Sequence, residues 1–233
     1  MTGRDYMRYL FDYWQSIERQ IKNAEKVFIL SDYDGTLTPI VKKPDLATLS
    51  EEMKQLLQSI AKNPHYKFAI ISGRSIEDVK KLVGLDGIYY AGNHGLEIDG
   101  PNICLTHPEA ARISPTMNII RKELQKEIGH LHGLIMEDKH LTLSVHYRLV
   151  LRENINVVKK ALKGVTEKYG EVKVTVGKKV FEIRPKIPWN KGVASLWILK
   201  SIANDALPVY LGDDETCLLY TSPSPRDRTI SYA

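Results

Sequence analysis

The chain has 233 residues, of which 43% are hydrophobic and 26% are charged, and its formal net charge is +5. This composition is ordinary for a soluble globular protein, and the length allows one large domain or a core with a smaller insert. The basic residues are dispersed among acidic ones, without a basic stripe interleaved with aromatics, so we expect no nucleic-acid partner.

Targeting features are equally sparse. No apolar run reaches the roughly 18 residues needed to span a bilayer, and the first residues lack the pattern of a secretory signal. Cys104 and Cys217 show no pairing pattern. We therefore expect no membrane partner and a reducing compartment, the cytoplasm.

The first predicted element is a helix over residues 5–24. Apolar residues recur there at spacings of three and four, at Tyr6, Leu10, Trp14, Ile17 and Ile21. That spacing forms one face of a helix. We expect a structural helix that packs on the edge of a sheet.

The next segment carries acidic chemistry. Residues 27–30 form an apolar run, which predicts a strand buried on both faces. Asp32 and Asp34 follow at its carboxyl end, where open α/β sheets bind ligands, and Gly35 turns the chain. Two carboxylates this close repel each other unless a cation such as Mg²⁺ offsets their charge. The alternative is an ordinary Asp-Gly turn.

The stretch Asp32-Tyr-Asp-Gly-Thr-Leu-Thr-Pro-Ile resembles the first motif of the haloacid dehalogenase-like phosphatases. Its form is especially similar to that of the trehalose-6-phosphate phosphatases. The resemblance implies that Asp32 attacks phosphorus and that Asp34 acts as acid and base. A carboxylate can form an aspartyl-phosphate, which divides one difficult displacement into two easier ones.

A second helix and strand follow. Ser50 caps a predicted helix that ends at Asn63-Pro64. Its expected buried face consists of Met53, Leu56, Leu57 and Ile60.

Residues 67–71 then form another short apolar strand, followed by Ser72, Gly73 and Arg74 and a helix over 75–83. Ser72 and the following amides are candidates to hold phosphate oxygens at the helix start. Ile-Ser-Gly-Arg matches the second motif of the same family, which makes Gly73 and Arg74 candidate substrate contacts. Arg74 can instead pair with Asp78, and we favour that structural pair.

A third strand begins at Ile88 and leads into a loop with Asn93 and His94 between two glycines. Glycines allow the backbone to approach a ligand closely. The loop is similar to the Gly-(Ser/Asn)-His-Gly loop of the trehalose-6-phosphate phosphatases. The resemblance implies that Asn93 and His94 face the sugar phosphate, although a lone histidine is more often structural.

Residues 112–186 have a different character. The pattern predicts a helix over 115–128, strands at 134–136 and 141–147, a helix over 155–169, and a hairpin of 171–176 with 179–183. The order αββαββ describes a small sandwich with one exposed sheet face. It looks like the mobile cap of the superfamily, which excludes water and selects the leaving group.

Four residues of this segment are candidate sugar contacts, namely Glu137, Lys139, Glu182 and Arg184. Their setting resembles the Glu-x-Lys and Glu-x-Arg-Pro segments of the family, and sugar hydroxyls need charged donors and acceptors. The alternative is a solvated strand face with cross-strand ion pairs.

The chain then returns to the core. Asn190 caps a predicted helix over 191–203, and Lys191 stands at its first turn, where the helix dipole disfavours a cation. An anionic partner would explain this placement. The resemblance makes Lys191 the lysine that steadies the nucleophile and the phosphate. An ordinary surface lysine is the alternative.

The last predicted strand, 208–211, ends in Gly-Asp-Asp, with acids at 213 and 214. It matches the fourth family motif. Asp213 and Asp214 would complete a Mg²⁺ shell begun by Asp32 and Asp34, with Asp213 the preferred direct ligand and water at the other positions.

Beyond Thr216 the family pattern stops. Residues 217–227 resemble the translation of a transposase sequencing adaptor, and residues 230–233 fit a further adaptor stretch. We expect residues 217–233 to be an artefactual tail that carries no functional information.

The sequence thus predicts an α/β fold: a Rossmann-like parallel-sheet core of the haloacid dehalogenase type with an inserted α+β cap. The expected domains are a C-terminally truncated core of residues 1–111 and 187–216 and a cap of residues 112–186. The expected function is Mg²⁺-dependent hydrolysis of trehalose 6-phosphate. The alternatives are another sugar phosphate (sucrose 6-phosphate or mannosyl-3-phosphoglycerate) and a non-catalytic module that binds trehalose-phosphate synthase.

Overall fold

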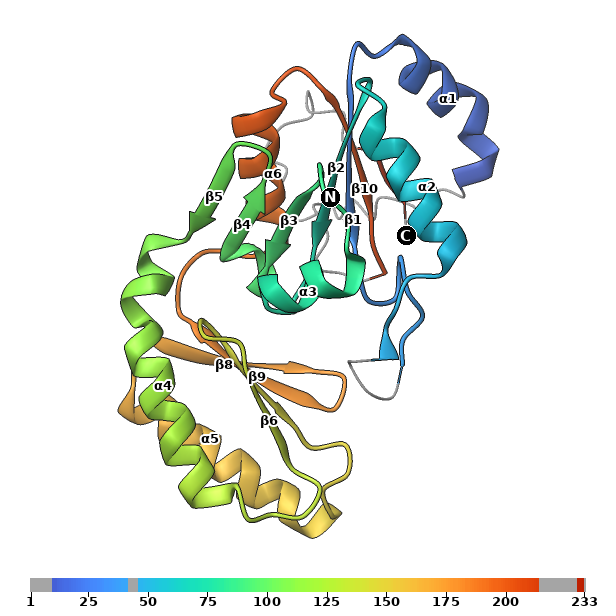
Figure 1. The fold of residues 1–233 in the computed structure, drawn as a ribbon. Coiled ribbons are helices and arrows are strands. Elements are labelled where there is room, and N and C mark those ends of the chain that lie inside the picture. Colours follow the sequence, from blue (N-terminus) through green and yellow to red (C-terminus); the bar gives the residue numbers. More distant parts are fainter. Residues whose placement is uncertain (1–9, 42–45, 214–229, 233) are drawn as a thin grey trace, which may run out of the picture. The chain divides into compact units, whose positions relative to one another are not determined.

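The computed structural model describes residues 10–41, 46–213 and 230–232 (Figure 1). The chain divides into two compact units. The first comprises residues 1–105 and 189–233, and the second comprises residues 106–188. Among the described residues, no helix combines the length and the apolar character needed to cross a bilayer.

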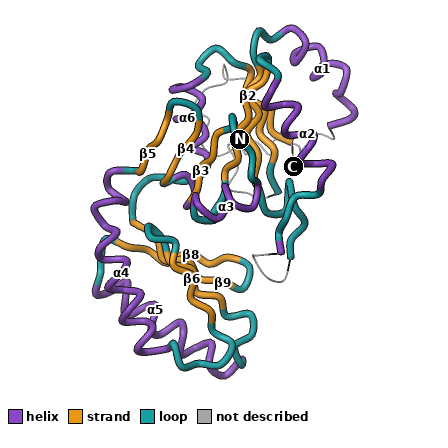
Figure 2. Tube along the Cα trace, viewed as in Figure 1, coloured by secondary structure: helices purple, strands orange, loops and turns teal. Residues whose placement is uncertain are grey.

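The first unit is built on a seven-stranded sheet in the order β11-β10-β1-β2-β3-β4-β5. Figure 2 shows strands of this sheet in orange, with β2, β3, β4 and β5 labelled. The strands are β1 (Val27–Asp32), β2 (Tyr66–Ile71), β3 (Tyr89–Gly92), β4 (Glu97–Gly100), β5 (Ile103–Thr106), β10 (Leu207–Leu211) and β11 (Ile230–Tyr232). The run from β11 to β3 is parallel, and β4 is antiparallel to β3. The predicted parallel core is confirmed, whereas β4 and β5 were not predicted from the residue pattern.

Strand β11 lies within the segment expected to be foreign, and it pairs with β10 at the sheet edge. Pairing does not reveal where a segment comes from, so the foreign origin of residues 217–233 stays a prediction.

Helices cover both faces of this sheet. The helices of the first unit are η1 (Leu10–Tyr13), α1 (Trp14–Asn23), α2 (Glu51–Lys62), α3 (Ile76–Val83) and α6 (Lys191–Ile202), with the short turn η3 (Asn93–Gly95) after β3, and α2, α3 and α6 provide this cover. Helix α6 packs on one face, where Ile198 joins a core with Phe28 and Leu30. Helices α2 and α3 pack on the other face, against Phe68 and Ile70 (Figure 1). This two-sided cover explains why β1 and β2 read as continuous apolar runs.

Helix starts follow the predicted capping chemistry. Ser50 Oγ accepts the N–H of Met53, and Asn190 Oδ1 accepts the N–H of Val193. The prediction was wrong at Leu56, whose side chain is 53% exposed. Residue 56 lies at the margin of the stripe centred on residues 53, 57 and 60, because a helix turns about 100° per residue.

The N-terminal helix is only partly as predicted. Its described part begins with η1, and α1 starts at Trp14, while residues 5–9 lie outside the described residues. Ile17 is buried, but Trp14 is 45% exposed. The spacing of apolar residues identified the helix but not how much of its apolar face is covered.

The second unit is an antiparallel sheet in the order β6-β7-β9-β8, with two helices packed against it. Its elements are α4 (Pro108–Ile128), β6 (Ile135–Asp138), β7 (Leu143–His146), η4 (Arg152–Asn154), α5 (Ile155–Lys168), β8 (Val172–Gly177) and β9 (Val180–Pro185). The order αββαββ is confirmed. The predicted helix start at Pro115 was wrong, because Pro108 occupies the first helical turn and Pro115 lies inside the helix.

Candidate active site

Asp32 ends β1 and is almost fully buried, with 1% of its surface exposed. Its Oδ1 accepts a hydrogen bond from the Tyr210 hydroxyl at 2.6 Å and lies 3.2 Å from Lys191 Nζ. Tyr210 comes from β10, where it pairs in register with Leu30. Side chains alternate along a strand, so Asp32 lies on the same face as Leu30, and this is the face that α6 covers. Lys191 is therefore buried against Asp32, whereas the alternative placed it on the surface.

Asp34 is bound by a different cation. Arg74 Nε donates to Asp34 Oδ2 at 2.9 Å, and Nη2 donates to Oδ1 at 2.7 Å. The third contact, from Nη1 to Asp78 Oδ2 at 2.9 Å, is the structural pair that we favoured from the sequence. The guanidinium also lies over the Tyr33 ring, 5.6 Å from its centroid. Burial alone would lower the pKa of Arg74, but the hydrogen bonds and charges of Asp34 and Asp78 outweigh burial and raise it.

The loops after β2 and β3 lie against each other. Ser72 Oγ accepts the N–H of Arg74 at 3.1 Å, and the Ser72 carbonyl accepts the N–H of His94 at 2.8 Å. A Cβ on Gly73 would come within 2.8 Å of His94 Cε1, so the imidazole packs directly on the glycine. The structure thus brings together the predicted residues Ser72, Gly73 and His94.

Asn93 is held by a residue that the sequence analysis did not select. Its Nδ2 donates to Glu97 Oε2 at 2.6 Å, and Asn93 itself is fully buried. Asn93 and His94 both have left-handed backbones, with φ of 49° and 59°. Such consecutive left-handed residues are strained, and strain of this kind is common at ligand sites. Glu97 stands two residues after the second glycine of the loop, and this closeness in sequence was the available signal for it.

The donor set for a metal is partly described. An added Cβ on Gly35 would lie 2.1 Å from Asp213 Oδ2, and one on Gly212 would lie 3.0 Å from Asp32 Oδ2. The two glycines thus let these carboxylates approach the loop backbones. Mg²⁺ in proteins commonly takes one or two carboxylates, with water and substrate phosphate at its other positions. Asp32 and Asp213 fit such a site.

The other two predicted Mg²⁺ ligands, Asp34 and Asp214, have less support as metal ligands. Asp214 lies outside the described residues. Both oxygens of Asp34 accept hydrogen bonds from Arg74. Within the described ranges, no group of three or more His, Cys, Asp or Glu side chains is arranged to hold a metal ion.

The second unit carries a polar cluster on its sheet. Glu137, Ser144 and Glu182 are aligned across β6, β7 and β9. Lys139 Nζ lies 3.6 Å from Glu182 Oε1 and 3.9 Å from Glu137 Oε1. His146 Nε2 lies 2.9 Å from Glu137 Oε2.

The cluster brings together three of the four candidate sugar contacts as ion pairs, with Lys139, just after β6, paired to Glu137 of β6 and to Glu182 of β9. The fourth, Arg184, stands beside Lys173 in the β8–β9 register. Burial lowers the pKa of Lys173, and the charge of Arg184 lowers it further. Ser144 was missed, and His146 was a polar residue of the predicted cap that was not among the candidate sugar contacts, although the strand alternation of β7 was the available signal for both.

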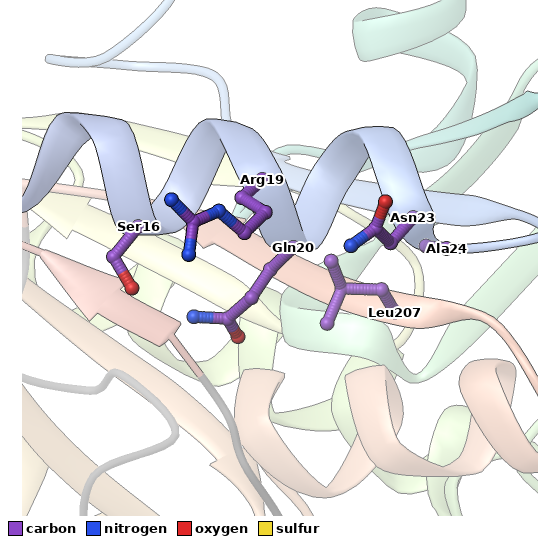
Figure 3. A pocket seen from close by; sticks show the side chains of 6 residues that line it. All are labelled: Ser16, Arg19, Gln20, Asn23, Ala24 and Leu207. Carbon is purple, nitrogen blue, oxygen red and sulfur yellow. The ribbon is translucent and has the colours of Figure 1, made fainter.

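A pocket of about 500 Å³ lies elsewhere in the first unit (Figure 3). Its lining comes from α1, from Ala24 directly after it and from Leu207, the first residue of β10. Leu207 pairs with Val27, the first residue of β1, so the pocket lies at the amino ends of strands whose carboxyl end carries Asp32. The lining contains no carboxylate, and the pocket is not a candidate for the chemistry of Asp32.

Fold and site together define the class of protein. A doubly wound sheet whose first strand ends in a buried aspartate, together with a separate α+β unit, has the α/β fold of a solved haloacid dehalogenase-like hydrolase from Bacteroides thetaiotaomicron, with a TM-score of 0.58 and 14% identity over 82% of this chain and 83% of that chain. A solved structure, the C-terminal domain of trehalose-6-phosphate phosphatase from Candida albicans, has this fold. It aligns with a TM-score of 0.74 and 24% identity over 92% of this chain and 78% of that chain.

Sequence comparison identifies the family. Residues 30–217 match the trehalose-phosphatase family model. Trehalose 6-phosphate phosphatase RA3 of Zea mays is 38% identical over 83% of this chain and 58% of its own length. Trehalose-phosphate phosphatase of Mycobacterium tuberculosis is 36% identical over 83% of this chain and 50% of its own. The chain belongs to the trehalose-phosphatase family, and it spans between half and three fifths of the length of these relatives.

Proposed function

We propose that this chain is a Mg²⁺-dependent phosphatase that hydrolyses trehalose 6-phosphate to trehalose and phosphate. The observation that carries the proposal is the buried Asp32 carboxylate, held by Tyr210 and Lys191 at the carboxyl end of β1. Membership in the trehalose-phosphatase family supports the substrate. The division into a phosphatase core (1–111 and 187–216) and a cap (112–186) is part of the same proposal.

In the first step, an oxygen of Asp32 attacks phosphorus, and the bond from phosphorus to the trehalose oxygen breaks. The departing oxygen takes a proton from Asp34, which leaves trehalose and an aspartyl-phosphate on Asp32. In the second step, Asp34 takes a proton from water, and the water oxygen attacks phosphorus. Phosphate leaves, and Asp32 is restored.

The charge of the transferring group must be balanced throughout. Lys191 supplies a buried positive charge beside Asp32, and the Ser72 hydroxyl supplies a hydrogen-bond donor. Uncatalysed hydrolysis of phosphate monoesters is so slow that these contacts must contribute much of roughly 20 kcal/mol. Mg²⁺ held by Asp32 and Asp213, and by Asp214 as an expectation from the sequence, would neutralise the phosphate oxygens.

Asp34 needs mobility for its two proton transfers. Arg74 donates a hydrogen bond to each of its two oxygens. The Asp34 side chain is 44% exposed. We infer that Asp34 gives up at least one Arg74 contact while it carries the proton and regains it after the proton has passed to the departing oxygen.

Substrate choice is assigned to the second unit. Lys139, a donor, lies within ion-pair distance of the two acceptors Glu137 and Glu182, and sugar hydroxyls can hydrogen-bond to both kinds of group. Arg184, Gly73, Arg74, Asn93 and His94 remain proposed substrate contacts. The ion pairs within the cluster would have to exchange partially for hydrogen bonds to the sugar.

The test is phosphate release from trehalose 6-phosphate with Mg²⁺ and with a chelator, using Asp32→Asn as the control. Release that needs both the metal and Asp32 supports the proposal. If phosphate is released only from sucrose 6-phosphate or mannosyl-3-phosphoglycerate, the proposed substrate is wrong but the proposed phosphatase mechanism stands. A folded chain that releases no phosphate, yet retains trehalose-phosphate synthase on a column, points to the non-catalytic alternative. We also propose a cytoplasmic location, which the free thiol of Cys104 supports.

A further inference from the structure

Tyr210 is a buried tyrosine whose hydroxyl is directed at the reacting carboxylate. It is 2% exposed, Asp32 is 1% exposed, and the hydroxyl donates to Asp32 Oδ1 at 2.6 Å. A donor to a carboxylate at this distance makes a short, charge-assisted hydrogen bond. Lys191 Nζ approaches the same oxygen at 3.2 Å. Two donors from separate elements therefore converge on Oδ1.

The two contacts on Oδ1 restrict the rotation of the Asp32 carboxylate about its Cβ–Cγ bond, the torsion χ2. That torsion is otherwise broad in aspartate. Donors from β10 and α6 restrict it, because both elements belong to the packed core around Asp32. The other oxygen, Oδ2, is directed toward Gly212.

Gly212 supports this arrangement independently. A Cβ there would lie 2.8 Å from Tyr210 Cε1 and 3.0 Å from Asp32 Oδ2. Any side chain at position 212 would push on the tyrosine ring and on the carboxylate together. The glycine therefore allows the Tyr210–Asp32 contact to form at the end of β10.

We propose that Tyr210 is a positioning residue that fixes Asp32 so that Oδ2 is the oxygen presented to phosphorus. The inference rests on the proposed function, because it assigns Asp32 the role of nucleophile. Attack needs a near-linear approach at about 3 to 3.5 Å, so a freely rotating carboxylate spends less time in a productive orientation. Losing the hydroxyl should therefore reduce kcat and leave KM for the sugar phosphate nearly unchanged.

The matched pair of variants is Tyr210→Phe and Tyr90→Phe. Tyr90 is also buried in the sheet of the first unit, but its hydroxyl donates to the backbone oxygen of Leu85 at 2.7 Å. Each variant loses one buried hydrogen bond and keeps the ring. With trehalose 6-phosphate we expect Tyr210→Phe to lower kcat about 10-fold, with KM changed less than about 2-fold, and Tyr90→Phe to leave both within about 2-fold.

A second measurement does not require turnover. Beryllium fluoride with Mg²⁺ forms a tetrahedral mimic of a phosphoryl group on an aspartate oxygen, so its affinity reports how well that oxygen is oriented. We expect Tyr210→Phe to weaken its binding about 10-fold, as measured by calorimetry, and Tyr90→Phe to leave it unchanged. A merely structural role for Tyr210 would affect the two variants alike.

The outcomes separate the inference from the proposed function. If the unaltered chain binds beryllium fluoride but hydrolyses no sugar phosphate, the proposed function fails and the weakened binding by Tyr210→Phe still supports positioning. If the unaltered chain does neither, both fail. The inference would be overturned, with the proposed function left standing, if Tyr210→Phe kept the wild-type kcat and the wild-type affinity for beryllium fluoride. It would also be overturned if Tyr90→Phe lost as much kcat and affinity as Tyr210→Phe.

Discussion

Arg74 binds both carboxylate oxygens of Asp34, with Nε 2.9 Å from Oδ2 and Nη2 2.7 Å from Oδ1. Asp32 stands only two residues earlier, yet it is paired with Lys191. The two acids of one short motif thus have separate cations, one from the loop after β2 and one from α6. Mutual repulsion between the acids is relieved by the protein itself, before any metal is considered.

The two-point contact predicts that Arg74 cannot be replaced by lysine. Lysine keeps the charge but cannot bind both oxygens in one plane. We expect Arg74→Lys to lower kcat for trehalose 6-phosphate about 10- to 100-fold, because Asp34 is no longer held in a fixed orientation. Arg112→Lys, at an exposed ion pair with Glu109, is the control and should behave as wild type. A raised KM with normal kcat would instead make Arg74 a substrate contact.

Replacement of the acid–base residue should depend on the leaving group. Nitrophenolate departs from p-nitrophenyl phosphate without needing a proton, whereas a sugar alkoxide needs one. We expect Asp34→Asn to reduce turnover of trehalose 6-phosphate by about 10² to 10⁴. With p-nitrophenyl phosphate it should give a rapid burst near one equivalent of nitrophenol, followed by slow hydrolysis of the aspartyl-phosphate.

The control for that experiment is Asp78→Asn, which alters the other partner of Arg74. Rapid-quench measurements should detect no burst with this variant. If Asp34→Asn slowed the first step equally with trehalose 6-phosphate and with p-nitrophenyl phosphate, the role of Asp34 as the acid would be contradicted.

Gly35 should not tolerate alanine, for two separable reasons. Its φ is +86°, which is strained for any other residue, and a Cβ there would lie 2.1 Å from Asp213 Oδ2. Gly87 has φ of +78° and no atom within 4 Å of an added Cβ, so Gly87→Ala measures the strain alone. We expect both variants to lose about 1 to 2 kcal/mol in urea unfolding.

Only Gly35→Ala should also raise the Mg²⁺ concentration needed for half-maximal activity, because only this variant displaces Asp213. An unchanged Mg²⁺ requirement in Gly35→Ala would remove Asp213 from the metal site.

Two buried tyrosines predict a loss of stability at alkaline pH. Burial raises the pKa of Tyr33 to about 12 and that of Tyr90 to about 12. Between pH 10 and 12 the unfolded chain loses these protons while the folded chain keeps them, so stability falls as pH rises. Each tyrosine should lower the free energy of unfolding by about 1.4 kcal/mol at pH 11, relative to pH 8. Urea unfolding at pH 8 and pH 11 should show that Tyr90→Phe loses less unfolding free energy between the two pH values than the unaltered chain, by the contribution of one tyrosine. An equal loss in both proteins would contradict the raised pKa of Tyr90.

The polar cluster of the second unit predicts that a substitution there changes substrate specificity and leaves the phosphoryl-transfer steps unchanged. Lys139 lies between Glu137 and Glu182, and its loss removes the donor between two acceptors. We expect Lys139→Met to raise KM for trehalose 6-phosphate about 10-fold or more and to leave turnover of p-nitrophenyl phosphate within about 2-fold. Lys168→Met is the control, because Lys168 forms an exposed ion pair with Glu123. Equal effects on the two substrates would place Lys139 outside sugar recognition.

Much of the fold was predictable because it depends on local patterns. Buried apolar runs identified β1 and β2, Ser50 and Asn190 were recognised as caps, and the order αββαββ followed from periodicity. The failures were also local. Pro115 was interpreted as the start of a helix that begins seven residues earlier, and β4 and β5 lacked a strong alternating pattern.

The sequence by itself determined which chemistry the chain carries. Asp32, Asp34, Ser72 and Lys191 stand at strand and helix ends that could be located from the residue pattern alone. Only the tertiary structure decided which of these groups meet. The pairing of Asp34 with Arg74, the contact of Tyr210 with Asp32 and the link between Asn93 and Glu97 depend on strand register and loop conformation. Hydrogen bonds act over about 3 Å, whereas sequence patterns locate an element only to within a few residues, so the partners become visible only after the sheet is assembled.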